Sequence, residues 1–110
     1  MAKKTKALIL VACGTAIATS TMVSEILRDE LVRKKKHNID FIHCTIMDLL
    51  EKVRLVNPDI IITTLSVEPE WRKEWEEKGI YYFKGMPLLT GIGEAELEDQ
   101  IEKILIEFGC

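Results

Sequence analysis

A cysteine stands where an apolar run gives way to small and hydroxyl-bearing residues. Cys13 follows the apolar run Lys6–Ala12, and residues 14–21 are glycine, alanine, threonine, serine and one isoleucine. A loop of small residues can turn its backbone N–H groups inward, and a helix start behind it adds partial positive charge. Such surroundings lower the pKa of a cysteine and increase the share of thiolate, which attacks phosphorus. Cys13 is therefore the candidate catalytic residue, the alternative being a cysteine that is simply buried at a strand end.

The composition of this loop separates two chemistries. Small cysteine-dependent phosphatases place an arginine six positions after the nucleophile, where it closes the phosphate-binding loop. Thr19 occupies that position here, and residues 13–21 contain no arginine or lysine. The segment between Lys84 and Gly93 offers no Asp or Glu as a general acid. Hydrolysis without a guanidinium group and an acid loses most of its transition-state stabilisation, so the pattern favours a thiol that carries phosphate.

The rest of the chain predicts an α/β fold with one parallel sheet. Unbroken apolar runs are typical of strands covered on both faces, and amphipathic spacing predicts the helices between them. The predicted strands are Lys6–Ala12, Ile39–Cys44, Ile60–Ile62 and Ile80–Phe83. The predicted helices are about Ser20–Lys35, a short helix or turn at Met47–Val53, and a last helix with the stripe Leu97, Ile101, Ile104, Leu105 and Phe108. Right-handed crossovers between such strands place helices on both faces of the sheet.

The carboxyl ends of parallel strands meet at one edge of a sheet, where open α/β folds place their sites. Cys44 and His43 could approach Cys13 at that edge, but we favour a core role for Cys44 and a solvent contact for His43. Thr63 and Thr64 either line the site or satisfy strand-end backbone groups, and we favour the site. The glycine-bearing segment 85–93 should lie beside it.

Two charged segments have simple structural interpretations. Trp71 and Trp75, within the charged segment 68–78, are four residues apart and share one face of a helix. We expect them to cover the core, the alternative being exposure for a partner protein. The basic cluster Arg33–Lys36 closes a predicted helix, where cations stabilise the negative end of the helix dipole.

Length and composition exclude several classes of protein. The chain of 110 residues, 47% hydrophobic and 30% charged, is expected to form one compact domain. A net charge of −3 gives no overall attraction to nucleic acid, and the run Ala7–Cys13 is too short to span a membrane. Three cysteines without a C-x-x-C pair and only two histidines argue against a disulfide scaffold or a metal site. No signal peptide is recognised, so a cytoplasmic location is expected.

The segment Ala12–Met22 closely resembles the phosphocysteine loop of IIB components of the bacterial sugar phosphotransferase system, the galactitol-specific type in particular. The similarity continues in Thr63–Thr64 and in Gly85–Gly93, so it spans nearly the whole chain. The charged segment 68–78 departs from the family pattern, because it is longer and more charged.

This resemblance implies a three-layer α/β/α fold with a four-stranded parallel sheet in the order 2-1-3-4, similar to the low-molecular-weight phosphatases. Residues 1–110 would form a single IIB phosphocarrier domain. A phosphohistidine on a IIA protein would donate to Cys13, which would pass the phosphoryl group to a sugar alcohol, galactitol, bound in the membrane IIC component. The resemblance implies no metal, cofactor, nucleic acid or membrane insertion. The phosphate-binding residues would be Gly14, Thr15, Ala16, Ile17, Ala18, Thr19 and Ser20.

Three other functions stay open at this point. The first is a hydrolase related to the low-molecular-weight phosphatases, which the missing arginine and acid disfavour. The second is a non-catalytic regulatory domain that keeps the fold and senses phosphorylation. The third is a redox thiol protein, for which the sequence offers no nearby resolving cysteine.

Overall fold

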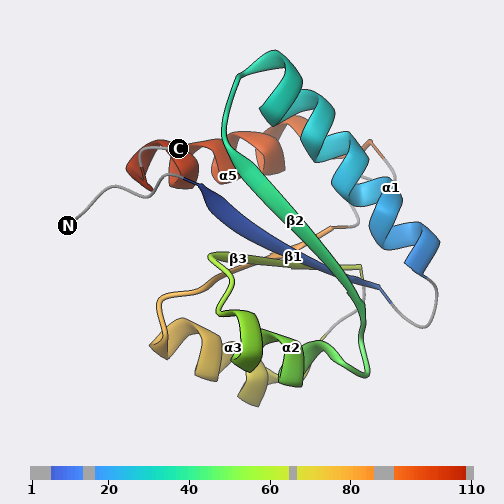
Figure 1. The fold of residues 1–110 in the computed structure, drawn as a ribbon, viewed down its shortest axis with the longest axis vertical. Coiled ribbons are helices and arrows are strands. Elements are labelled where there is room, and N and C mark those ends of the chain that lie inside the picture. The colour runs from blue at the N-terminus through green and yellow to red at the C-terminus, as the bar shows by residue number, and fades with distance from the viewer. Residues whose placement is uncertain (1–5, 14–16, 65–66, 86–90, 109–110) are drawn as a thin grey trace.

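The computed structural model has four parallel strands in one sheet, in the order β2-β1-β3-β4. It describes residues 6–13, 17–64, 67–85 and 91–108 (Figure 1). The parallel pairing and the strand order confirm the predicted sheet. In chain order the elements are β1 (Ala7–Cys13), α1 (Ile17–Leu27), η1 (Arg28–Lys34), β2 (Ile39–Thr45), α2 (Leu49–Val56), β3 (Ile60–Thr63), α3 (Pro69–Glu77), β4 (Tyr81–Lys84) and α5 (Glu94–Phe108).

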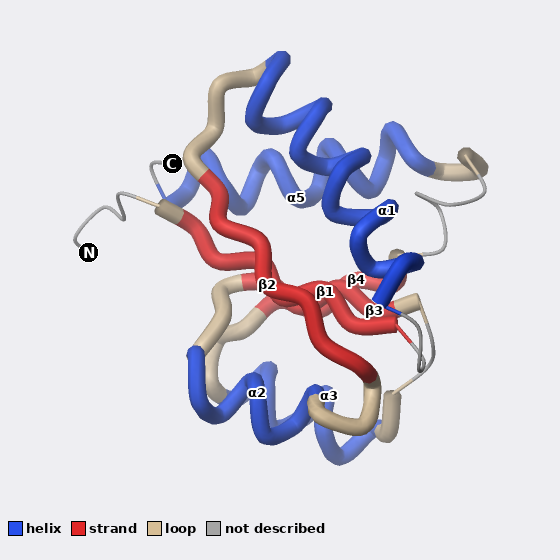
Figure 2. The backbone as a smooth tube through the Cα atoms, turned by 45° about the vertical axis from the view of Figure 1, so that its right-hand side comes forward, coloured by secondary structure: helices blue, strands red, loops and turns tan. Residues whose placement is uncertain are grey.

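Helices cover both faces of this sheet, which gives the three predicted layers. α1 and α5 lie on one face, and α2 and α3 lie on the other (Figures 1 and 2). Side chains of the central strand β1 alternate between two core clusters: Ile9 and Val11 pack toward α1 and α5, and Leu10 and Ala12 toward α2 and α3. A strand buried on both faces needs apolar residues at successive positions, which explains the unbroken apolar run.

The element boundaries differ from the predicted ones around the candidate site. β1 runs one residue further and includes Cys13, because the ladder with β2 continues to the pair Cys13–Thr45. α1 starts at Ile17 rather than near Ser20, and the helix continues through the wider π-type turns of η1. Serine and threonine have only modest helix propensity, and the first turn carries no apolar periodicity, so the sequence pattern does not reveal this early start.

Asp59 makes hydrogen bonds to residues of β1 and β4 at the end of the sheet opposite Cys13. The Leu8 N–H donates to Asp59 Oδ2 at 2.8 Å, and the Asp59 N–H donates to the Leu8 carbonyl at 2.9 Å. The Tyr81 N–H donates to the Asp59 carbonyl at 3.1 Å. One residue thereby fixes the relative positions of β1, β3 and β4.

The charged segment 68–78 forms α3, with Pro69 at its first position. Trp75 is fully buried, with its ring centroid 5.8 Å from that of Tyr82 and 6.4 Å from that of Trp71. Trp71 is partly buried against the same cluster. The two tryptophans therefore cover the core, as expected, while the charged residues of α3 face outward. One of them, Glu74, accepts a hydrogen bond from Arg54 of α2 at 3.0 Å.

The basic cluster Arg33–Lys36 is a solvated helix end held by ion pairs. Lys34 Nζ lies 3.2 Å from Glu30 Oε2, and Lys35 Nζ lies 3.3 Å from Glu102 Oε1 on α5. Glu102 also contacts His37 Nε2 at 2.9 Å, and this hydrogen bond is the main reason that the pKa of Glu102 is lowered. The simple structural interpretation of this cluster is confirmed.

Candidate active site

Cys13 is the last residue of β1, a central strand of the sheet. Its Cα is paired with that of Thr45 on β2. The preceding residue, Ala12, lies between Cys44 on β2 and Thr63 on β3. The sheet therefore brings the predicted strand-end residues to one edge, beside Cys13.

The helix α1 begins four positions after Cys13. Of the predicted phosphate-binding residues, Gly14, Thr15 and Ala16 lie outside the described residues, and Ile17, Ala18, Thr19 and Ser20 form the first turn of α1. N–H groups in the first turn of a helix have no carbonyl one turn earlier to accept from them, so they are available to an anion. The backbone at this end of α1 is thus suited to a phosphoryl group.

Thr63 ends β3 with a fully buried side chain. Its Oγ1 lies 2.7 Å from the hydroxyl oxygen of Tyr82, the residue that stacks on Trp75. The Thr63 hydroxyl therefore joins the strand end to the aromatic layer beneath α3. Arg72 of α3 lies over the Tyr82 ring, with its guanidinium carbon 5.1 Å from the ring centroid.

Backbone hydrogen bonds continue the sheet edge beyond β3. The Thr64 N–H donates to the Ala12 carbonyl at 3.2 Å, and the Gly85 N–H donates to the Thr63 carbonyl at 2.7 Å. A Cβ at position 85 would lie 2.9 Å from Ile62 Cγ2, so the close approach of the chain requires glycine there. Residues 86–90 of the predicted glycine-bearing segment lie outside the described residues.

His43 lies on β2 two residues before Thr45, and the expectation that it simply meets solvent is wrong. Its side chain is partly buried, and Nε2 lies 3.2 Å from Ser24 Oγ on α1. Ser24 is only 1% exposed, because α1 packs closely over this part of β2. The pair links the helix that follows Cys13 to the strand beside it.

Cys44 belongs to the core, as favoured from the sequence. It is 6% exposed and packs with Ala12, Leu49 and Val53 beneath the sheet. It also lines a cavity of about 310 Å³ at the outer side of β2, together with Asp48, Lys52 and the exposed Leu55. Cys110 lies outside the described residues.

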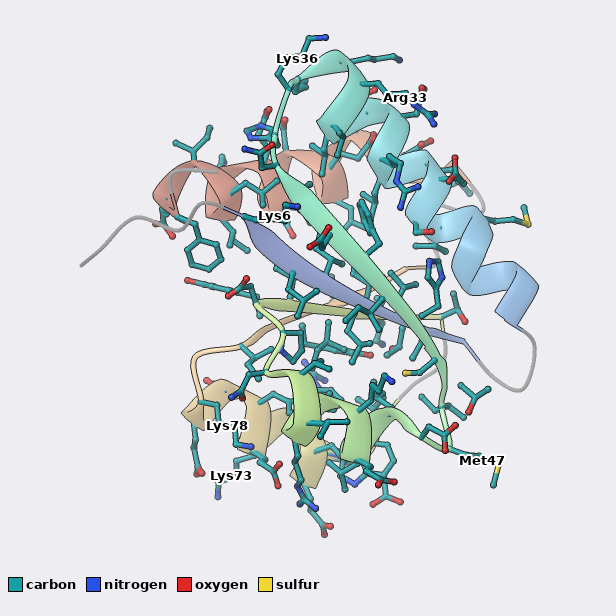
Figure 3. All side chains as sticks on the ribbon, in the orientation of Figure 1. Lys6, Arg33, Lys36, Met47, Lys73 and Lys78 are labelled. Carbon is teal, nitrogen blue, oxygen red and sulfur yellow. The ribbon has the colours of Figure 1, made fainter. Side chains whose placement is uncertain are left out.

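Figure 3 shows how the labelled charged side chains lie relative to this end of the sheet. Lys6, Arg33 and Lys36 stand toward the amino ends of β1 and β2, and the 82% exposed Met47 projects at the carboxyl end of β2. β1, β2 and β3 end in the uncharged residues Cys13, Thr45 and Thr63, whereas β4 ends in Lys84, whose Cα is paired with that of Thr63. No group of three or more His, Cys, Asp or Glu side chains that could hold a metal ion occurs among the described residues.

Residues 8–103 match the family model described as "PTS system, Lactose/Cellobiose specific IIB subunit". The chain belongs to the PTS IIB family. It is 32% identical over 97 residues to the galactitol-specific EIIB component of the PTS system of Escherichia coli K12, a match that covers 88% of this chain and 94% of that protein. The Shigella flexneri component of the same name is 31% identical, with the same two coverages.

Membership of the PTS IIB family makes the chain a component of a sugar phosphotransferase system. The names of its relatives differ in the sugar. The family description names lactose and cellobiose, and the two relatives above are named for galactitol. A further Escherichia coli K12 relative, 29% identical over 90% of this chain and 97% of its own length, is named only as a phosphotransferase enzyme IIB component.

Sequence reasoning missed two hydroxyl groups beside the predicted residues. Ser24 lies three positions before the buried Leu27, on the apolar face of α1, and a buried hydroxyl there requires a hydrogen-bond partner. That spacing could have indicated the contact with His43. Tyr82 lies within β4, and nothing in the local sequence pattern indicates that its hydroxyl group reaches the hydroxyl group of Thr63.

Within the described part of the chain, no helix is both long enough and apolar enough to cross a membrane.

Proposed function

We propose that this chain is the phosphocarrier of a sugar phosphotransferase system and that Cys13 carries the phosphoryl group. The Cys13 thiolate attacks the phosphorus of a phosphohistidine on a IIA protein. A P–S bond forms, the P–N bond breaks, and its electron pair stays on the histidine nitrogen as the imidazole leaves. A hydroxyl oxygen of a sugar alcohol bound in a membrane IIC component then attacks the same phosphorus. The P–S bond breaks, the thiolate leaves, and the hydroxyl proton goes to solvent. Galactitol is the proposed sugar, from the names of the relatives.

The observation that carries the proposal is the position of Cys13 at the end of a central strand, four residues before α1. Partial positive charge at a helix N-terminus favours the thiolate over the thiol. It also stabilises the charge of about −1.5 to −2 that a phosphoryl group brings. A stabilised thiolate is both a good acceptor and a good leaving group, as a carrier requires.

The remaining parts of the site follow from the same geometry. Backbone N–H groups would hold the phosphoryl oxygens without a metal or a cofactor, along Gly14, Thr15, Ala16, Ile17, Ala18, Thr19 and Ser20. Residues 1–110 would act as one IIB unit in the cytoplasm, where the donor is found. Neither nucleic acid nor insertion into the membrane has a place in this proposal.

Two assays separate the carrier from the hydrolase and name the sugar. With phosphorylated IIA protein and membranes that contain a galactitol IIC component, the chain should support formation of galactitol phosphate. With an aryl phosphate ester, it should release no inorganic phosphate above the rate of a Cys13→Ser variant. Transfer to lactose or cellobiose but not to galactitol would contradict the proposed sugar. Rapid, Cys13-dependent ester hydrolysis would contradict the carrier.

A further inference from the structure

His43 and Ser24 form a polar pair between α1 and β2, inside an otherwise apolar contact. The Ser24 side chain is 1% exposed, and its Oγ lies 3.2 Å from His43 Nε2. Val11, the register partner of His43 on β1, is fully buried. The imidazole is therefore held in a partly desolvated position by a hydroxyl that can accept from, or donate to, its Nε2 atom.

The strand register places the Cα atom of His43 close to that of Cys13 and keeps the Cα atom of the other histidine far away. His43 lies two residues before Thr45, the partner of Cys13, so the Cα atoms of His43 and Cys13 are about 8 Å apart. Ile39, two residues after His37, is paired with Ala7 at the other end of β1. His37 is therefore more than about 20 Å from Cys13.

Among the described residues, two elements next to His43 carry charged side chains. On α1, Glu25 and Arg28 are paired at 3.3 Å, and the Arg28 guanidinium carbon lies 5.2 Å from the ring centroid of Phe41. Beyond the outer side of β2, the cavity that His43 helps to line carries Asp48, Glu51 and Lys52. These charges are present whether or not Cys13 is modified. A phosphoryl group on Cys13 would add negative charge at the end of β1, a strand whose described side chains are apolar.

We infer that His43 senses the phosphorylation of Cys13, binding a proton from solvent when the phosphoryl group arrives and releasing it when the group leaves. This inference rests on the proposed function. The imidazolium Nε2–H donates to Ser24 Oγ, and its charge balances part of the phosphoryl charge. The coupling is reciprocal, so protonation of His43 favours phosphorylated Cys13 by the same factor. His43, on β2, is thus a charge-balancing residue beside a loop, residues 13–21, that contains no arginine or lysine.

The direct test follows the two imidazole rings by NMR as the pH is changed. The titration midpoint of His43 should move to higher pH by roughly 0.5–1 unit when Cys13 is phosphorylated, a three- to tenfold coupling. The midpoint of His37 should move by less than about 0.2 unit, because it is remote and screened. Mass spectrometry of the same sample establishes whether Cys13 carries the phosphate.

Alkylation of Cys13 by a charged and by a neutral reagent tests the coupling to His43 without phosphoryl transfer. In a Cys110→Ser background, in which the buried Cys44 reacts slowly, iodoacetate adds a negative charge to Cys13 and iodoacetamide adds a neutral group of similar size. Carboxymethylation should raise the His43 midpoint by about half the shift expected for phosphate. Carbamidomethylation should leave it within about 0.1 unit, since it adds no charge.

Variants connect the titration to function. The equilibrium constant for phosphoryl transfer from the IIA protein should rise as the pH falls through the His43 midpoint. His43→Gln keeps a hydrogen bond to Ser24 and should remove this three- to tenfold component, while His37→Gln should retain it. Absence of phosphate on Cys13 would overturn the proposed function, and the alkylated pair would still decide the coupling. A His43 titration midpoint that is unmoved by carboxymethylation would overturn the inference about His43. So would an equal pH dependence of the transfer equilibrium constant in His43→Gln and His37→Gln.

Discussion

Replacement of Cys13 by serine should lower phosphoryl transfer to sugar by about a thousandfold or more while the fold is retained. A serine hydroxyl is almost fully protonated near neutral pH, so it is a weak nucleophile toward phosphohistidine. A serine phosphate, once formed, has an alkoxide as its leaving group and does not pass its phosphoryl group on. The measurement is the rate of sugar phosphate formation with excess IIA protein and IIC-containing membranes.

Cys44 supplies the matched control for this prediction. It lies on the neighbouring strand, in register with Ala12, and its side chain is buried in the core. Cys44→Ala should leave the transfer rate within about threefold and lower the free energy of unfolding by about 1 kcal/mol, since little volume is removed. A strong loss of transfer in Cys44→Ala together with activity in Cys13→Ser would place the phosphoryl group on Cys44 and contradict its assignment to Cys13.

Trp75→Ala should produce the largest loss of stability, about 3–5 kcal/mol in the free energy of unfolding. The side chain is fully buried between α3 and the sheet and contacts both Tyr82 and Trp71. Its removal leaves a cavity beneath α3 that the rigid sheet cannot fill. Urea unfolding followed by circular dichroism measures the change, and a loss of that size comes close to unfolding a domain of this length.

Two milder variants keep this prediction testable if Trp75→Ala does not fold. Among the described residues, the buried Nε1 of Trp75 has no hydrogen-bond partner, so Trp75→Phe should lose mainly packing and cost about 1–2 kcal/mol. Trp71→Ala removes a partly exposed ring and should cost about 1–2 kcal/mol. A loss above about 3 kcal/mol in Trp71→Ala, or below about 0.5 kcal/mol in Trp75→Phe, would contradict the assignment of Trp75 as the central residue of this layer.

The sheet was predictable because its strands are buried on both faces. Unbroken apolar runs such as Lys6–Ala12 and Ile60–Ile62 are typical of parallel strands that helices cover on both faces. The boundary at Cys13 was missed because the strand end depends on pairing with Thr45, a partner distant in the sequence. The start of α1 was missed because its first turn has no apolar stripe.

The place of Cys13 at the end of a strand was predictable from the sequence, because the apolar run gives way to small residues there, and its role as the site residue stays a prediction. The pairs Ser24–His43 and Thr63–Tyr82 each join two residues that lie 19 positions apart in the chain and belong to different elements. The position of Ser24 on the apolar face of α1 indicates that its hydroxyl needs a partner, but no local pattern identifies that partner as His43.

The most direct test of the carrier is the location of the phosphate after incubation with the phosphorylated IIA protein. Peptide mass spectrometry at neutral to alkaline pH, which spares phosphocysteine, should find one phosphate per chain, on Cys13. Addition of IIC-containing membranes and galactitol should then remove it as galactitol phosphate forms. Phosphate on another residue, or none on a chain whose donor is fully phosphorylated, would contradict the assignment of Cys13 as the carrier.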